Sequence, residues 1–183
     1  MSEVSERYRK LAAQFTQRAK AVPDGAWDNP SPCEGWVARD VVGHLVEWLP
    51  AFFVGTWGIE FRLGPSVDDD PVGAWEAVDA AIQAALDDPE IAGSERDTPM
   101  GRSTFEQTIA MICIADVLVH TWDLARATGL DETLDADEVH RFAQTMEPAD
   151  EAMRQSGHYG PRVEMPDDAD ELTKVIAFTG RHP

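Results

Sequence analysis

Apolar residues recur at helical spacing along most of this chain. Near the N-terminus they fall at Tyr8, Leu11, Ala12, Phe15 and Ala19, which lie on one face of a helix with about 3.6 residues per turn. The same spacing predicts helices at about residues 4–22, 37–53, 72–86, 103–128, 135–155 and 171–178. The sequence therefore predicts an all-α protein.

The segments between these helices are rich in proline, glycine and aspartate. Residues 55–71 and 87–102 are long and irregular, and residues 156–161 form a further predicted loop. No segment shows the alternation of apolar and polar residues that is typical of a β-strand. Because two of the connections are long, we do not expect the helices to follow one another as plain up-and-down hairpins.

Length and composition are those of an ordinary soluble domain. The 183 residues, 43% of them hydrophobic, are enough for one substantial core. No apolar run approaches the roughly eighteen residues that a membrane helix needs, and the N-terminal segment lacks the apolar centre of a signal peptide. We therefore expect a single cytoplasmic domain that spans residues 1–183.

The charge of the chain excludes some classes of partner. The formal net charge is −19 at pH 7. Binding to nucleic acid or to an anionic membrane surface requires a basic face, which this composition does not favour. The charge is compatible with cations and small neutral ligands, although an acidic surface more often serves only solubility.

One carboxylate lies within the most apolar stretch of the chain. Between Ile109 and Val119, Asp116 is the only charged residue, and His120 follows it four positions later. Burying an unpaired carboxylate is costly, so a buried one is normally paired, protonated or bound to a metal. Residues four positions apart share a helix face. Asp116 and His120 can therefore point together into the core of a helical protein.

A second pair with the same spacing, Asp40 and His44, lies on the helix predicted at residues 37–53. Asp40 falls in the first turn, where a carboxylate favours the helix dipole and caps the helix. His44 lies on an apolar face, where a histidine is either hydrogen-bonded within the core or a ligand. Together with Asp116 and His120 it would supply two imidazoles and one carboxylate, a pattern typical of catalytic metal sites with an open position.

These residues also have structural interpretations that involve no metal. Asp116 could pair with an arginine from another helix, and His44, Asp116 and His120 could form a buried polar network without a metal. No zincin motif, nucleotide-binding glycine loop or serine nucleophile motif occurs in the sequence. These three residues are therefore the main candidates for the chemistry of the chain, and the catalytic residues remain unassigned.

For the other candidate residues, a structural role is favoured over a functional one. Asp123 could orient a ligand, but an ion pair with Arg126 is favoured. Trp48 and Trp122 are interpreted as core residues. Cys33 has no neighbour in the sequence that would activate its thiol. We therefore assign no catalytic role to any of them.

Three segments resemble a known family. Residues 32–45, Pro-Cys-Glu-Gly-Trp-Val-Ala-Arg-Asp-Val-Val-Gly-His-Leu, resemble the first metal motif of the DinB/YfiT-like superfamily and, more closely, of the mycothiol-dependent maleylpyruvate isomerases of actinobacteria. Residues 116–129, from Asp116 to Gly129, resemble the second motif of those enzymes. Residues 177–181 resemble the end of a small metal-binding subfamily.

The resemblance implies a four-helix bundle with a crossover connection, to which this chain would add C-terminal helices. It also implies one divalent metal, zinc or nickel, with His44, Asp116 and His120 as its ligands. In the isomerases the middle ligand is a glutamate, whereas this chain has the shorter Asp116. No separate C-terminal domain of the isomerase type is expected.

The implied function is activation of a low-molecular-weight thiol such as mycothiol for transfer to, or isomerisation of, an electrophilic small molecule. Members of the family also make a homodimer plausible. Two functions remain open from the sequence: a metal-dependent, thiol-dependent transferase or isomerase, and a non-catalytic metal-binding sensor or carrier associated with stress. The sequence identifies no catalytic acid or base that would decide between them.

Overall fold

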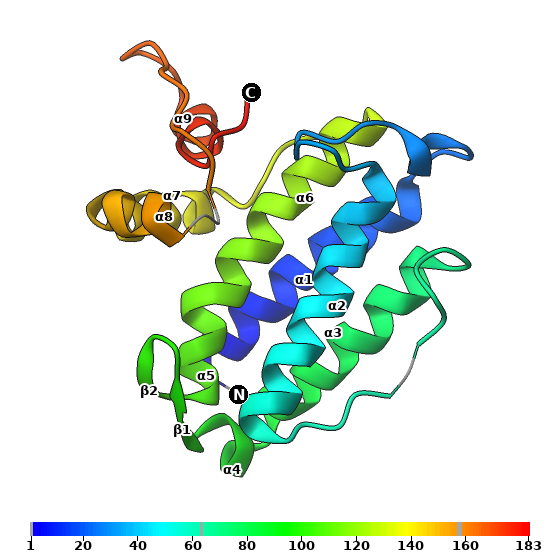
Figure 1. Cartoon of the computed structure of the whole chain (residues 1–183), viewed down its shortest axis with the longest axis vertical. Helices are drawn as coiled ribbons and strands as arrows, with labels where there is room; N and C mark the ends of the chain where they lie inside the picture. Colours follow the sequence, from blue (N-terminus) through cyan, green and yellow to red (C-terminus); the bar gives the residue numbers. More distant parts are fainter. Residues whose placement is uncertain (1, 63, 157–158) are drawn as a thin grey trace.

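The structure is a computed structural model that describes residues 2–62, 64–156 and 159–183. Four long helices run side by side and form the body of the molecule (Figure 1). They are α1 (Glu3–Ala21), α2 (Ala38–Trp57), α3 (Pro71–Asp87) and α6 (Ile114–Thr128). Helices α1 and α2 each pack against both α3 and α6. The prediction of an all-α protein is confirmed.

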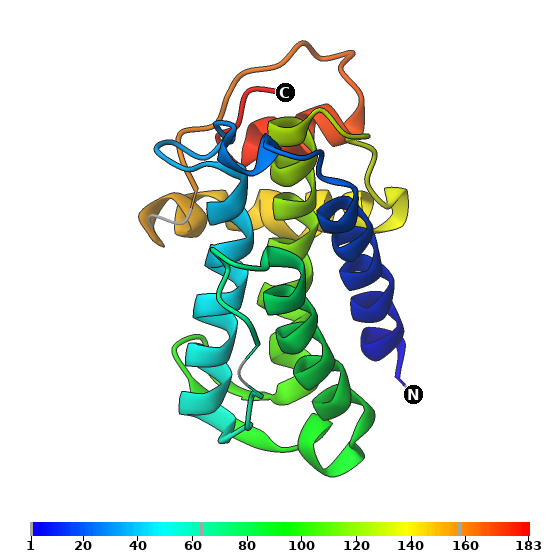
Figure 2. The same cartoon turned by 90° about the vertical axis from the view of Figure 1, so that its right-hand side faces the viewer.

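Helices α2 and α3 run in the same direction along this bundle (Figures 1 and 2). The described parts of the segment between them, residues 58–62 and 64–70, therefore return along the side of the bundle before α3 begins. Gly58 ends α2 in the left-handed conformation, with φ of 67°. Asp70 caps α3 by accepting a hydrogen bond from the Gly73 amide, and Pro71 occupies the first turn. This long connection accounts for the irregular composition of the segment.

The core lies where the apolar faces of the four helices meet. The predicted face of α1 is buried throughout: Tyr8, Leu11, Ala12, Phe15 and Ala19 are each no more than 2% exposed. Phe15 meets Trp75 of α3 edge to face, with ring centroids 4.8 Å apart. The spacing of apolar residues in α1 therefore predicted its buried face correctly.

The helix predicted at residues 103–128 begins at Phe105, after its cap Thr104. It runs as a short helix, α5 (Phe105–Thr108), through a π-helical turn at Ile109–Cys113, and into α6. By length and hydropathy, Phe105–Thr128 could cross a membrane, although 72% of its most apolar window is buried within the protein. This high hydropathy is that of a central core helix, which agrees with a soluble protein.

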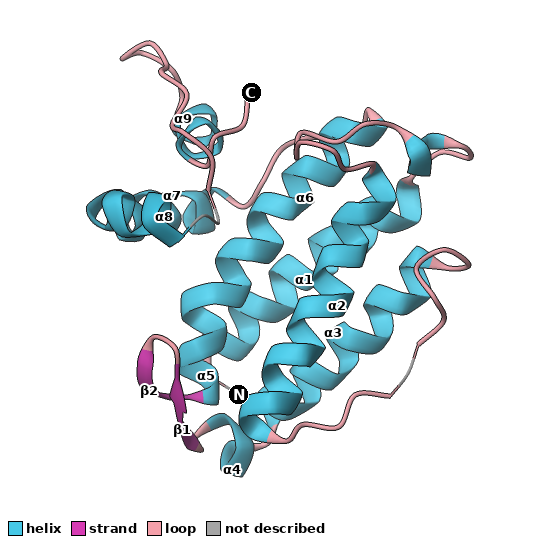
Figure 3. Ribbon diagram, in the orientation of Figure 1, coloured by secondary structure: helices cyan, strands magenta, loops and turns pink. Residues whose placement is uncertain are grey.

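A β-hairpin was not predicted. It consists of β1 (Glu95–Thr98) and β2 (Gly101–Thr104), which pair antiparallel across a two-residue turn (Figure 3). A short helix, α4 (Pro89–Ala92), precedes it. Seven of the eight strand residues are exposed or only partly buried, and Ser103 alone is buried. Because no buried face exists, these strands carry no alternation of apolar and polar residues.

The C-terminal part differs from the prediction at one point. In place of one helix at residues 135–155, the chain forms α7 (Ala136–Met146), a 3-10 turn (Glu147–Ala149) and α8 (Asp150–Ser156). Pro148 lacks an amide hydrogen, which explains the interruption. The final helix, α9 (Glu171–Phe178), agrees with the prediction and packs against α7. Residues 157 and 158 of the predicted loop at 156–161 lie outside the described residues.

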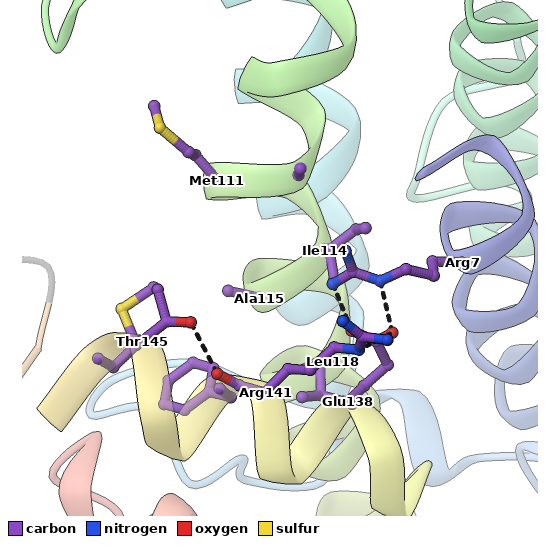
Figure 4. Close-up of a pocket in the computed structure, with 11 residues that line it drawn as sticks. Arg7, Met111, Ile114, Ala115, Leu118, Glu138, Arg141 and Thr145 are labelled. Carbon is purple, nitrogen blue, oxygen red and sulfur yellow. Dashed lines mark hydrogen bonds and ion pairs between the residues drawn. The ribbon is translucent and has the colours of Figure 1, made fainter. Parts of the chain in front are cut away.

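Two hollows lie away from the predicted ligands. A small pocket of about 40 Å³ lies between α6 and α7. The ion pair between Arg7 and Glu138 closes one side of this pocket (Figure 4). An open groove of about 820 Å³ follows α3, α4 and the end of α2. The linings of these two hollows include none of His44, Asp116 and His120.

Candidate metal centre

The structure brings the three predicted ligands together. His44 projects from α2, whereas Asp116 and His120 lie one turn apart on α6, which packs against α2. One potential ligand atom from each residue lies within 4.8 Å of the other two. The two helices therefore place two imidazoles and a carboxylate around one point.

The distances within this cluster suit a shared metal better than direct hydrogen bonds. The Nε2 atom of His44 is 3.4 Å from Oδ2 of Asp116, and Nε2 of His120 is 3.4 Å from Oδ1 of Asp116. A hydrogen bond between nitrogen and oxygen is normally about 2.9 Å long. Two ligands that each lie about 2.0–2.1 Å from one zinc ion at a tetrahedral angle are about 3.3–3.4 Å apart. The donor set and its spacing thus fit a divalent metal.

Neighbouring side chains orient the cluster. The indole Nε1–H of Trp48, one turn after His44 on α2, donates a hydrogen bond of 2.8 Å to Oδ2 of Asp116. The Nδ1 atom of His120 is 2.8 Å from Oδ2 of Asp123. With Nδ1 held in this way, His120 presents Nε2 toward Asp116, as a metal-ligating histidine does.

The carboxylate of Asp116 and the imidazole of His120 each shift the pKa of the other toward its charged form. Burial by itself would raise the pKa of Asp116, but the neighbouring His120 and His44 hold it below its usual range. Burial by itself would lower the pKa of His120, but Asp116 and Asp123 raise it well above its usual value. Asp116 is therefore ionised, as a carboxylate ligand must be, and metal binding would displace a proton from His120.

One side of the cluster is open to solvent. The side chains of His44 and Asp116 are 32% and 26% exposed, whereas that of His120 is 7% exposed. The ring of Trp36 stacks on His120 with centroids 5.9 Å apart and also adjoins His44. A small molecule could thus approach the open side along an aromatic wall.

A second group of possible ligands, Cys33, His120 and Asp123, is unsuited to a metal. Both oxygens of Asp123 accept hydrogen bonds of 2.7 Å from Arg181, and the same guanidinium lies 3.3 Å from the Cys33 sulfur. A fixed cation at this position would repel a metal ion. His44, Asp116 and His120 therefore form the better candidate centre.

Two interpretations from the sequence are corrected here. Asp123 does not pair with Arg126: it pairs with Arg181, while Arg126 pairs with Glu132. Trp48 is not simply a core residue, because it is only partly buried and binds Asp116. Its position four residues after His44 was the signal that could have placed it at the site.

Other interpretations agree with the structure. The carboxylate of Asp40 accepts a hydrogen bond of 2.8 Å from the Val37 amide and caps α2, as predicted. Trp122 is 2% exposed and belongs to the core. Among the described residues no arginine pairs with Asp116, which argues against the ion-pair alternative.

The fold and the cluster define a helical bundle with a candidate metal centre. Residues 8–54 match the mycothiol maleylpyruvate isomerase N-terminal domain, which confirms the resemblance predicted from residues 32–45. The matched region contains His44 and ends before Asp116. It therefore supports the family resemblance, whereas the grouping of all three candidate ligands rests on the distances in the structure. The chain is thus similar to a mycothiol-associated family of DinB/YfiT-like type.

Curated relatives extend this similarity over most of the chain. The uncharacterized proteins MT0763 and Rv0738, from the CDC 1551 / Oshkosh and H37Rv strains of Mycobacterium tuberculosis, are each 28% identical to it over 154 residues. The similar region covers 83% of this chain and 83% of each relative. No solved structure matches the chain significantly.

Proposed function

We propose that this protein binds one divalent metal ion through His44, Asp116 and His120 and uses it to activate a low-molecular-weight thiol of the mycothiol type. The observation that carries the proposal is the cluster of two imidazoles and one ionised carboxylate, open to solvent on one side. Imidazole and carboxylate donors suit zinc or nickel. A metal bound there would lower the pKa of a coordinating thiol, which makes the sulfur nucleophilic at neutral pH.

The protein's own residues would position the metal and the reactants. Trp48 fixes the carboxylate of Asp116, and Asp123 fixes the ring of His120. Trp36 covers one side of both imidazoles and limits the approach of a substrate to the open side. In the proposed reaction the thiol loses its proton, and its sulfur forms a bond to an electrophilic carbon of a small molecule while either a halide leaves that carbon or the π bond of a carbon–carbon double bond opens. In the second case the proton returns to the neighbouring carbon to give the thiol adduct, or the carbon–sulfur bond breaks again after rotation, which regenerates the thiol and leaves an isomerised molecule. The outcome is transfer or isomerisation of that molecule.

The wider biological setting follows from the same proposal. The expected partners are a small-molecule thiol and its electrophilic substrate, with no role for nucleic acid or a membrane. We place the protein in the cytoplasm, where low-molecular-weight thiols remain reduced. A homodimer stays a prediction from the family resemblance.

Loss of thiol chemistry on removal of the metal is the expected result of a direct test. Metal-loaded protein is incubated with mycothiol and a panel of electrophiles, including an aromatic halide and an unsaturated ketone, and thiol consumption is measured. We expect consumption above the background of His120→Ala, loss after chelation and recovery after zinc or nickel is restored. If the protein binds one ion per chain but consumes no thiol with any electrophile, it is a non-catalytic metal-binding protein instead.

A further inference from the structure

The carboxylate of Asp123 is fully buried, and both of its oxygens accept hydrogen bonds. Its side chain is 0% exposed, and Arg181 donates to both of its oxygens, from Nε to Oδ1 and from Nη2 to Oδ2, each at 2.7 Å. This two-point contact fixes the plane of the carboxylate. Oδ2 is also the atom that lies 2.8 Å from Nδ1 of His120. The orientation of one candidate ligand is thus connected to the C-terminal segment of the chain.

The Asp123 carboxylate also fixes a hydrogen on one nitrogen of His120. Both of its oxygens accept hydrogen bonds from the Arg181 guanidinium, the two-point contact that a carboxylate forms with an arginine, so Asp123 is an acceptor toward His120 as well. Nδ1 of His120 must then donate to it, and Nε2 is left for the metal. Without Arg181, Asp123 would lose the two-point contact that keeps it oriented.

The fold brings Arg181 to this position by a close backbone contact. After α9 the chain turns at Gly180, which has φ of 88° and lies against Gly160. A Cβ atom at position 180 would lie 2.8 Å from the Gly160 Cα, so a glycine is required there. Arg154 donates hydrogen bonds to the carbonyls of Gly160 and Phe178 and thus joins the same two segments. These contacts hold the segment at residues 179–181 against the chain around Gly160, and the Arg181 side chain docks the segment onto α6 through Asp123.

We propose that Arg181 is a positioning residue of the metal centre, which acts through Asp123 to hold His120 in its ligating orientation. The inference rests on the proposed function, since it concerns the affinity of the same site for its metal. By linkage, docking of residues 179–181 strengthens metal binding, and metal binding in turn stabilises the docked segment. The C-terminal segment is then part of the metal centre although it supplies no ligand.

The affinity for Co²⁺, measured by competition with a chromophoric chelator, tests this assignment. Arg181→Gln is expected to weaken Co²⁺ binding by about 10–100-fold, the usual effect of removing a residue that orients a ligand. Arg126→Gln is the matched control, because it removes the same charge from an arginine that pairs with Glu132 instead. It should leave the affinity unchanged. Arg181→Lys keeps the charge without the two-point contact and should give an intermediate loss.

A double-mutant cycle separates this role from a merely structural one. If Arg181 acts through Asp123, then Arg181→Gln should cost little further Co²⁺ affinity in a protein that already carries Asp123→Asn. Equal losses in both backgrounds, or an unchanged affinity in Arg181→Gln, would overturn the assignment. Hydrogen exchange should also show slower exchange of the 179–181 amides when Co²⁺ is bound.

A measurement on the metal-free protein distinguishes failure of this inference from failure of the proposed function. The side-chain nitrogen resonances of His120 report whether Nδ1 donates a hydrogen bond, whether or not any metal binds. We expect a slowly exchanging Nδ1–H in the unaltered protein and in Arg126→Gln, and its loss in Arg181→Gln. If the unaltered protein bound no Co²⁺ but showed this pattern, the proposed function would be wrong, whereas the contact from Arg181 through Asp123 to His120 would be confirmed. An Nδ1–H signal that is retained in Arg181→Gln would contradict the inference.

Discussion

Replacing His120 with alanine is expected to weaken binding of Zn²⁺ or Co²⁺ by about 100- to 1,000-fold. A zinc site with four protein ligands binds its metal with about 10–16 kcal/mol, so an equal share for one ligand is about 2.5–4 kcal/mol. His120 is also the least exposed member of the cluster, with 7% of its side chain accessible, so water would replace the lost imidazole poorly. Calorimetric titration of the metal-free protein measures the change.

His140→Ala is the matched control for this substitution. His140 is exposed on α7, where its ring nitrogens contact Glu171 and Gln144 and none of the three candidate ligands. Its removal should leave the metal affinity unchanged. An equal loss in both variants, or no loss in His120→Ala, would mean that the measured binding occurs elsewhere on this acidic protein.

Replacing Asp79 with asparagine is expected to stabilise the protein at neutral pH. Asp79 lies half-buried on α3, and burial raises its pKa to about 6. The Tyr8 hydroxyl on α1 and the charge of Arg9 lower this pKa only in part, and the charge of Glu76 adds to the rise. In the unfolded chain the pKa of an aspartate is about 3.9. Ionisation of Asp79 above pH 6 therefore opposes folding.

The sign of the effect follows from proton linkage. Between about pH 4 and pH 6 the folded state holds more protons than the unfolded state, so the free energy of unfolding falls as the pH rises. Each pKa unit corresponds to about 1.4 kcal/mol. Asp79→Asn should therefore raise the free energy of unfolding by up to about 3 kcal/mol at pH 7.5 and change it little at pH 3.5.

Denaturant unfolding at the two pH values, with chelator present to remove metal effects, checks this result. Asp87→Asn on the same helix is the control of opposite sign. Asp87 accepts hydrogen bonds from Ser5 and Arg9, which hold its pKa below the usual range. Its removal should lower stability at pH 7.5. A gain from Asp79→Asn that did not depend on pH would contradict the assigned cause.

The three candidate ligands could be predicted because their signal is local. The spacing of Asp116 and His120 places both on one face of a helix, and the apolar residues around them indicate that this face is buried. His44 carries the same signal on a second helix. The contact between those helices was expected from the family resemblance and could not be derived from either segment alone.

Asp123 was considered as a residue that orients a ligand, but two further side chains that hold the site, Trp48 and Arg181, were missed for physical reasons. Trp48 fits the helical pattern as an apolar residue, although its indole also donates a hydrogen bond to Asp116. Arg181 is 58 positions from Asp123, so no local spacing connects them. The hairpin at residues 95–104 lacks a buried face, and hydrophobic periodicity cannot detect a strand of that kind.

Elemental analysis of the purified protein tests the central claim most directly. Asp116 and Asp40 each precede a histidine by four residues, but Asp116 faces the cluster whereas Asp40 caps α2. We predict one divalent ion per chain in the unaltered protein and in Asp40→Ala, and none in Asp116→Ala. An unaltered protein without a divalent metal after growth and purification with zinc and nickel supplied, or an Asp116→Ala variant that retained its full metal content, would contradict the account.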